Sequence, residues 1–422
     1  MICRGNSPIP IPISDMAQGI PSWLNIDFTE RILRLAEDDS TVQVIDIFTK
    51  PATAKGDNYT SDMIRVTVEF TRNQGVKKGV NEKKSLIFKF EPIEGGTRQE
   101  LIQKIQIFDT EISMMTVTLK KMSDMLGTRL CARVYHVRME RPLCLIMEDL
   151  AVEGFRMADR QAGLDLTHSM IAIKGLARLH AASVALCEKE PKHKGMYRKG
   201  FFSDEYPEEM FQFITYAGQG LIAAMEGWED VDKSYAEKLK KLVPHIYSKG
   251  ITITKRRDDD FNVINHGDCW VNNMLFRYDE NSKPIEHIFV DFQLSLYGSP
   301  SIDLHYFFNT SLNEDVYDNH MDDLYEEYLR VLSATMKQLG CKTQPITIEE
   351  LHRVLRRMGL CALVASMTVL PLILVDKGDV KDIQELMDKD CMTAHPGFTN
   401  AAYRKIMSKR LVKFDEMGLL EP

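Results

Sequence analysis

The segment NHGDCWVNN, at residues 265–273, places acidic and amide side chains in a short stretch around a glycine. Asp268 precedes Asn273 by five residues, and a later apolar run ends on Asp291 in FVDFQ. The residues on either side of DENSKP predict a hairpin, with Asn273 at the start of one arm and Asp291 at the end of the other. Because these ends of an antiparallel hairpin are adjacent, we expect Asp268, Asn273 and Asp291 to lie close together.

This cluster suits phosphoryl transfer. Mg²⁺ prefers hard oxygen ligands, and usually takes one or two from the protein when it also binds phosphates. The Asn273 carbonyl and the Asp291 carboxylate meet that demand, which leaves Asp268 free to accept a proton from an attacking hydroxyl. The spacing from Asp268 to Asn273 is that of the HxDxxxxN loop of protein-kinase-like enzymes. We expect His266 to shape the loop through hydrogen bonds.

Phosphoryl transfer also requires a cation on the nucleotide phosphates, and Lys89 lies where one is needed. Lys89 belongs to the predicted strand 85–91, and Glu111 follows beside the apolar stripe of a predicted helix. A carboxylate next to an apolar stripe is costly to bury without a partner. A strand lysine paired with a helix glutamate supplies that partner and holds the lysine in place.

Two further segments stand where a nucleotide would bind. KGDNYTS, at 55–61, joins two predicted strands, and its backbone N–H groups and Ser61 are expected to cover the phosphates. LIMEDL, at 145–150, follows the helix, and we expect it to form a hinge facing the adenine edge. The residues predicted to contact the nucleotide, or to hold one that does, are Lys89, Glu111, Gly56, Asp57, Asn58, Tyr59, Ser61, Met147, Glu148 and Leu150.

The remaining pattern predicts an α+β protein, with a small antiparallel sheet followed by a larger helical part. Alternating apolar and polar residues predict strands at 42–48, 63–70 and 85–91. Helical periodicity dominates the later part of the chain. We expect a flexible tail over 1–20, an N-lobe over 21–147, a C-lobe over 148–422 and a hinge near 147–151.

Four local features are predicted less directly. Residues 22–38 read as an amphipathic helix, capped by Asn25 or Asp27. The charged stretch 72–84 is predicted to be a loop, and 98–122 one helix. The apolar run LCALVASMTVLPLILV, at 360–375, is short for a membrane span and contains a proline, so we expect a buried helix.

Composition narrows the function classes. The chain has 422 residues and a formal net charge of −8, which argues against a dedicated nucleic-acid or anionic-membrane binder. Its eight cysteines include no CxxC pair, which indicates reduced thiols in a cytoplasmic protein.

The motifs together resemble a known family. HGDCWVNNMLFRYD and VDFQLSLYGSPSIDLHYFFNTS are similar to the insect ecdysteroid kinase-like family, also called CHK-kinase-like, within the aminoglycoside and choline kinase group. GDNYTSDMIRVTVEF, FDTEISMM and LIMEDL fit the same family. The resemblance covers about residues 25–415. It implies a two-lobed protein-kinase-like fold and ATP- and Mg²⁺-dependent phosphorylation of a small-molecule hydroxyl, on an ecdysteroid or a similar apolar alcohol.

The resemblance also implies residue roles. Asp268 would be the catalytic residue, and Asn273 and Asp291 the Mg²⁺ ligands. Asp303, in SPSIDL, would brace the catalytic loop, and His180 would pack in the core. Gln293 stands where protein kinases have the glycine of DFG, and the short segment before SPSIDL leaves no room to dock a peptide. Both departures favour a small-molecule substrate over a protein.

Three alternatives remain open. The acceptor could be of the choline or aminoglycoside type, or the protein could bind a ligand without catalysis. A metal-assisted hydrolase using His266, Asp268, His287 and Asp291 is the third. The aromatic and Met-rich segment 195–230 either lines an acceptor pocket or only packs its helices.

Overall fold

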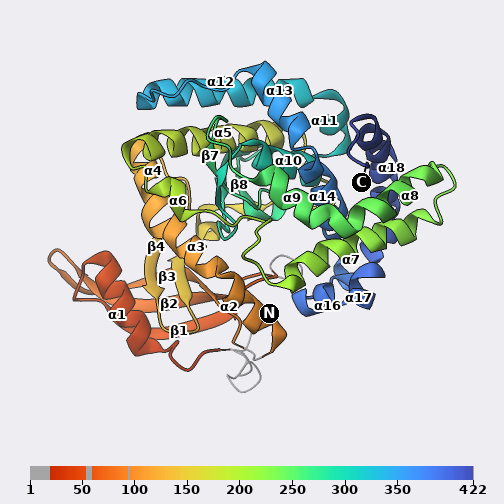
Figure 1. Cartoon of the computed structure of the whole chain (residues 1–422). Helices are drawn as coiled ribbons and strands as arrows, with labels where there is room; N and C mark the ends of the chain where they lie inside the picture. Colours follow the sequence, from red (N-terminus) through yellow and green to blue (C-terminus); the bar gives the residue numbers. More distant parts are fainter. Residues whose placement is uncertain (1–19, 54–58, 94–95, 422) are drawn as a thin grey trace, which may run out of the picture.

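The N-terminal part of the computed structural model is built on one antiparallel sheet. The structure describes residues 20–53, 59–93 and 96–421. The five strands lie in the order β1-β2-β3-β5-β4 and span Gln43–Pro51 (β1), Asp62–Gln74 (β2), Lys77–Phe90 (β3), Val134–Arg138 (β4) and Cys144–Glu148 (β5). Figure 1 shows this sheet, with the red helix α1 (Ile26–Glu37) beside it, below the helical part.

Alternation in the strands explains how α1 and the sheet pack. Val66, Val68 and Phe70 on β2 are buried, and they share one apolar cluster with Ile32 and Leu33 of α1. The Asn25 side chain caps α1 by accepting a hydrogen bond of 3.0 Å from the Phe28 amide. Asn25 is therefore the cap, rather than Asp27.

The predicted loop over 72–84 is wrong. Strands β2 and β3 continue as a long hairpin that turns at Gly75, where φ is +57°. The charged side chains in this stretch pair across the strands: Arg72 contacts Glu82 at 2.8 Å, and Lys83 contacts Glu69 at 2.6 Å. The many charged residues of 72–84 indicated a loop, but they form ion pairs between neighbouring strands instead.

The predicted single helix over 98–122 is also wrong. Helix α2 (Thr97–Ile105) ends at Gln106, whose left-handed backbone (φ +58°) lets its amide bond to the Ile102 carbonyl. Helix α3 (Ile107–Ser113) starts directly afterwards, and a π-helical turn over Met114–Thr118 joins it to α4 (Leu119–Leu126). After this break, α2 packs against α16 (Ile383–Met387), while α3 carries Glu111 to Lys89.

The later part of the chain is mostly helical (Figure 1). Its long helices are α5 (Leu166–Lys189), α7 (Glu208–Met225), α12 (Met321–Leu339) and α18 (Ala401–Glu416). Shorter helices are α6 (His193–Met196), α8 (Lys233–Leu242), α9 (Ile246–Thr254), α10 (Ser301–Thr310), α11 (Glu314–Asn319), α13 (Ile348–Arg357), α14 (Leu360–Thr368), α15 (Leu370–Leu374), α16 (Ile383–Met387) and α17 (Lys389–Thr393). An N-terminal sheet followed by a helical part confirms the α+β prediction, whereas the exact lobe boundaries stay a prediction.

Small strands in the helical part carry the loop of interest. The antiparallel sets are β7 (Val263–Asn265) with β10 (Leu296–Gly298), and β6 (Arg156–Met157) with β8 (Met274–Tyr278) and β9 (Pro284–Phe289). Helix α5 is the one described single helix that is long and apolar enough to cross a membrane, and 72% of its apolar window is buried inside the protein. Helices α14 and α15 are buried throughout, as predicted for 360–375.

Candidate active site

The hairpin β8–β9 brings the three predicted residues together. The Val290 amide donates to the Asn273 carbonyl at 3.0 Å, which joins the start of one arm to the end of the other. The Asn273 side-chain nitrogen donates to the Asp268 carboxylate at 2.9 Å and to its backbone carbonyl at 3.0 Å. Asp291 directly follows Val290 with a left-handed backbone, at φ +68°. Asp268, Asn273 and Asp291 therefore surround one point.

Lys89 on β3 connects this cluster to the N-terminal sheet. Its side chain is 2–3% exposed and lies 2.7 Å from Glu111 of α3 and 2.8 Å from Asp291. Burial by itself would lower the pKa of Lys89, but the charges of Asp291 and Glu111 outweigh it and raise the pKa. Burial raises the pKa of Glu111, against the attraction of the Lys89 ammonium. Lys89 thus ties two carboxylates from distant parts of the chain to one cation.

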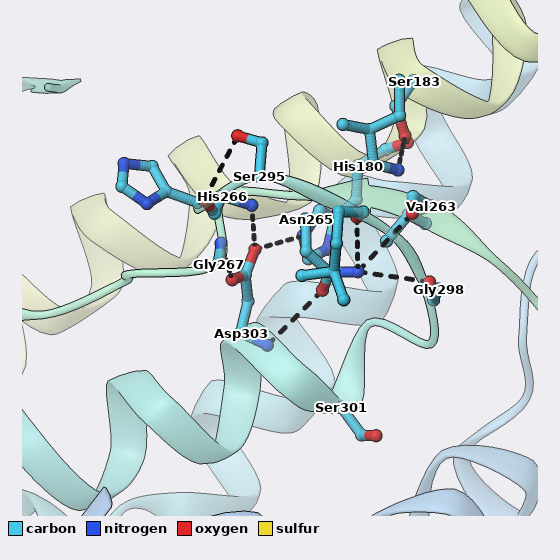
Figure 2. Close-up of polar contacts among 12 residues, drawn as sticks. His180, Ser183, Val263, Asn265, His266, Gly267, Ser295, Gly298, Ser301 and Asp303 are labelled. Atoms are coloured by element: carbon cyan, nitrogen blue, oxygen red, sulfur yellow. Dashed lines mark hydrogen bonds and ion pairs between the residues drawn. The ribbon is translucent and has the colours of Figure 1, made fainter. Parts of the chain in front are cut away.

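Helix α10 holds the loop through Asp303, as Figure 2 shows. The buried Asp303 carboxylate accepts hydrogen bonds from the His266 amide at 2.6 Å and the Gly267 amide at 2.8 Å. His180 of α5 donates to the same carboxylate at 3.0 Å, and its other ring nitrogen bonds to the Tyr328 hydroxyl. Asp303 therefore contacts the loop backbone, and His180 is buried in a polar network.

His266 and Gly267 fix the shape of the loop. The His266 ring donates from Nε2 to the Val290 carbonyl at 3.0 Å and accepts from the Asp268 amide at 3.2 Å. Burial lowers the pKa of His266, which favours this neutral ring. Gly267 has φ +85°, and a Cβ there would lie 1.9 Å from the Leu294 carbonyl oxygen. Only glycine fits at this close approach.

The environment of Asp268 suits a proton acceptor. Burial, together with the negative charge of Asp291, raises the pKa of Asp268 to about 7, although hydrogen bonds from Tyr306 and Asn273 oppose the shift. Such a carboxyl is close to half protonated at neutral pH. It can therefore both take up and release a proton under those conditions.

Two cavities meet at Asn273 and Asp291. The first has a volume of about 290 Å³, and its lining includes Lys89, Glu111, Met147, Glu148 and Leu150. The second, here called the acceptor cavity, has a volume of about 140 Å³ and has Asp268 in its wall. Asn273 and Asp291 line both. The two cavities therefore share the part of the wall that Asn273 and Asp291 form.

The model of the ecdysteroid kinase-like family matches the chain over residues 55–341, which is more than half of it. The chain belongs to the ecdysteroid kinase-like family. Membership supports a small-molecule kinase. Among solved structures, an ethanolamine kinase from Plasmodium vivax is similar at 14% identity and a TM-score of 0.36, covering 85% of this chain and 84% of that chain. No curated protein matches the chain.

The segment predicted to be a hinge is held by Asp149, a residue that the sequence analysis missed. Asp149 follows β5, and it accepts hydrogen bonds from Arg65 on β2 at 2.7 Å and from Ser85 on β3 at 2.6 Å. Its carboxylate also caps the next turn by accepting from the Ala151 amide at 3.2 Å. These contacts fix the backbone beside Glu148 and Leu150. The acidic end of LIMEDL was the available signal.

The predicted phosphate-covering loop is only partly described. Gly56, Asp57 and Asn58 lie outside the described residues. Tyr59 lines the acceptor cavity, and Ser61 lines neither of the two cavities. Arg98 of α2 holds this end of the loop by donating to the carbonyls of Tyr59 at 3.3 Å and Ser61 at 3.1 Å.

The acceptor cavity has an apolar wall built from several parts of the chain. Phe201, Met210 and Phe213 come from the segment 195–230, which was one candidate for this wall. Other apolar residues of the wall were not predicted. They include Leu101, Ile102 and Ile105 of α2, and Ile383, Leu386 and Met387 of α16. The apolar stripe of α2 was the available signal for the first three. The polar lining includes Asn273, whose side chain contacts Asp268.

The geometry does not favour the hydrolase alternative. The His287 ring packs against Phe276 and Phe289, with centroids 5.2 Å and 4.2 Å away, and burial lowers its pKa to about 3. Within the described residues, no group of three or more His, Cys, Asp or Glu side chains could hold a metal. His287 therefore reads as a core residue.

Proposed function

We propose that the protein transfers the γ-phosphoryl group of ATP to a hydroxyl of a small apolar alcohol, an ecdysteroid or a similar molecule, with the help of Mg²⁺. The observation that carries the proposal is the position of Lys89. Its ammonium bridges Glu111 and Asp291 in the wall of the larger cavity, and Asp291 also lines the cavity that has Asp268 in its wall. A lysine held by a glutamate, a loop aspartate and a second aspartate are the parts that phosphoryl transfer to a hydroxyl requires.

In this proposal the larger cavity holds the nucleotide. Lys89 contacts the phosphates, and Glu111 keeps the Lys89 side chain from swinging away. The adenine lies against Met147, Glu148 and Leu150, which line the same cavity as Lys89. Asp149 keeps that hinge rigid through Arg65 and Ser85.

The oxygens of Asn273 and Asp291 fit a magnesium ion. The side-chain nitrogen of Asn273 donates to Asp268. The side-chain oxygen of Asn273 is therefore the atom that can bind a cation. One Asp291 oxygen accepts from Lys89, and no hydrogen bond joins the other to any described residue. One amide oxygen and one carboxylate, with phosphates and water, is a set that Mg²⁺ accepts. When bound, the ion would neutralise phosphate charge, while Asp268 takes the proton of the attacking hydroxyl.

The acceptor cavity determines the second substrate in this proposal. Its apolar wall favours an acceptor with an apolar body and its reactive hydroxyl at the Asp268 end. The volume of about 140 Å³ is below the roughly 300 Å³ at which pockets for drug-sized ligands begin. A compact alcohol therefore fits the cavity as it stands, whereas a steroid requires the cavity to widen.

The proposal is tested by following γ-phosphoryl transfer from ATP to a panel of hydroxysteroids, small apolar alcohols, choline and an aminoglycoside. We expect transfer to at least one apolar alcohol, and its loss in Asp268→Ala. Transfer to choline or to the aminoglycoside alone would overturn the apolar acceptor. Binding of Mg-ATP without transfer to any alcohol would indicate a silent binding protein, and equal turnover by Asp268→Ala would remove Asp268 from the mechanism.

A further inference from the structure

Gln293 occupies an unusual position in the wall of the acceptor cavity. It follows Asp291 by two residues and lines the acceptor cavity, while it is not part of the lining of the nucleotide cavity. The residue is 6% exposed, so almost all of it is sealed by protein. The small exposed part belongs to the cavity wall. A polar side chain in this place needs a partner for each end of its amide.

One end of the Gln293 amide is already engaged. Its Oε1 accepts a hydrogen bond from the Thr60 hydroxyl at 2.9 Å, and Thr60 lines the same cavity. Within the described residues, the amide nitrogen of Gln293 has no hydrogen-bond partner. An amide donor in a cavity wall that no described protein acceptor engages is free to bind a ligand that supplies an acceptor oxygen.

The backbone on both sides of Gln293 holds the amide in place. The ring of Phe292 packs against His266 at 4.6 Å between centroids, and the Leu294 carbonyl closes against Gly267. The Ser295 hydroxyl donates to the His266 carbonyl at 3.2 Å. Gln293 is thus fixed to the same loop that carries Asp268, which is the rigidity a recognition group needs.

We infer that Gln293 is a specificity residue that donates a hydrogen bond from its amide nitrogen to a second oxygen of the acceptor, close to the hydroxyl that is phosphorylated. This inference rests on the proposed function. Because Gln293 faces the acceptor cavity and not the nucleotide cavity, the oxygen belongs to the alcohol. The substrate class is therefore an apolar molecule with two neighbouring oxygens, such as a vicinal diol or a hydroxyketone.

The test compares matched acceptors that differ only in the second oxygen. The probes are 1,2-octanediol with 1-octanol, and a vicinal-diol steroid with its mono-ol. We expect the kcat/KM of the wild type to be about tenfold to hundredfold higher for the diol, because only the diol supplies an acceptor oxygen to the Gln293 amide. Gln293→Met keeps the length of the side chain but lacks the donor, so it should lose this preference while its KM for ATP stays unchanged.

A control variant and a binding measurement keep the test decisive. Gln384→Met makes the same change on an exposed residue of α16, next to the cavity wall, and should keep the preference. Equal preference in wild type and Gln293→Met would overturn the inference, as would a rise in KM for ATP instead. If the wild type phosphorylates no alcohol, the proposed function fails. The inference about Gln293 is then tested by calorimetric binding of the diol to the wild type and to Gln293→Met. Equal affinity for the two proteins, or binding to neither, would overturn the inference.

Discussion

Lys89 holds together two carboxylates that belong to different parts of the chain. Its ammonium contacts Glu111 at 2.7 Å and Asp291 at 2.8 Å, and water is almost excluded. Removing one member of a buried ion pair leaves an uncompensated charge, which costs more than the pair itself contributes. The energetic role of Lys89 can therefore be separated from its chemical role.

We predict that Lys89→Met abolishes phosphoryl transfer and lowers the free energy of unfolding by about 3–5 kcal/mol, because Glu111 and Asp291 then lack their cation. The double variant Lys89→Met/Glu111→Gln should recover part of that stability and none of the activity. Chemical denaturation and a transfer assay measure the two effects. A double variant no more stable than Lys89→Met would refute this explanation.

Gly267 provides a second prediction for a single residue. Gly267→Ala would place a Cβ 1.9 Å from a backbone oxygen, whereas Gly340→Ala has a similar positive φ and open space around it. We expect Gly340→Ala to cost about 1 kcal/mol, and Gly267→Ala at least about 3 kcal/mol more, with loss of activity. Thermal unfolding of the two variants checks this. Equal losses would mean that the loop moves freely away from Leu294.

The sequence predicted some site residues and missed others for a physical reason. The proximity of Asp268, Asn273 and Asp291 follows from one hairpin, so local pattern was enough. Asp149 depends on Arg65 and Ser85, which lie 84 and 64 residues earlier in the chain. No local pattern encodes such a contact. The same holds for the bond between Thr60 and Gln293.

At the scale of elements, α10 supports the reactive loop. Asp303 lies in its first turn and accepts the amides of His266 and Gly267 together with the His180 ring. Asp303→Asn would set an amide nitrogen against one of these donors. We predict a loss of about 2–4 kcal/mol in unfolding free energy and a fall in kcat, with Asp322→Asn on α12 as an exposed control. Calorimetry and turnover measure both, and a neutral Asp303→Asn would contradict the bracing role.

Element boundaries show where pattern reading fails. The apolar stripe continues through Gln106, so nothing in IQKIQIF signals the end of α2 there. The break depends on where α2 and α3 pack: α2 lines the acceptor cavity, and α3 carries Glu111 toward Lys89. Tertiary contacts therefore override a continuous helical period. The α+β class, by contrast, followed from alternation and periodicity over many residues.

For the whole molecule, a buried histidine predicts how stability depends on pH. Burial lowers the pKa of His305 to about 4, and its Nε2 donates to the Leu355 carbonyl at 2.8 Å. Between about pH 4 and 6.5 the unfolded chain binds the extra proton and the folded chain does not, so His305 makes the protein less stable as pH falls.

His305→Gln removes this titration and keeps an amide donor for Leu355. We predict that the free energy of unfolding falls by about 2 kcal/mol more in the wild type than in the variant between pH 7 and pH 5. The reason is that pH 5 lies about 1.5 units below the ordinary histidine pKa, and each unit corresponds to about 1.4 kcal/mol. Denaturant unfolding at the two pH values gives the difference. Comparison with the variant is essential because the raised pKa values of Asp268 and Glu111 act in the opposite direction. Parallel losses in both proteins would contradict the prediction.

The central claim is that one site, built from Lys89, Glu111, Asp268, Asn273 and Asp291, carries a phosphoryl group from nucleotide to alcohol. The most direct measurement is single-turnover transfer from γ-labelled Mg-ATP to the best apolar acceptor, in wild type and Asp268→Asn, with nucleotide affinity measured in parallel. The account predicts unchanged nucleotide binding and a rate about 10²- to 10⁴-fold lower in Asp268→Asn. Equal rates of labelled product in the two proteins would contradict it.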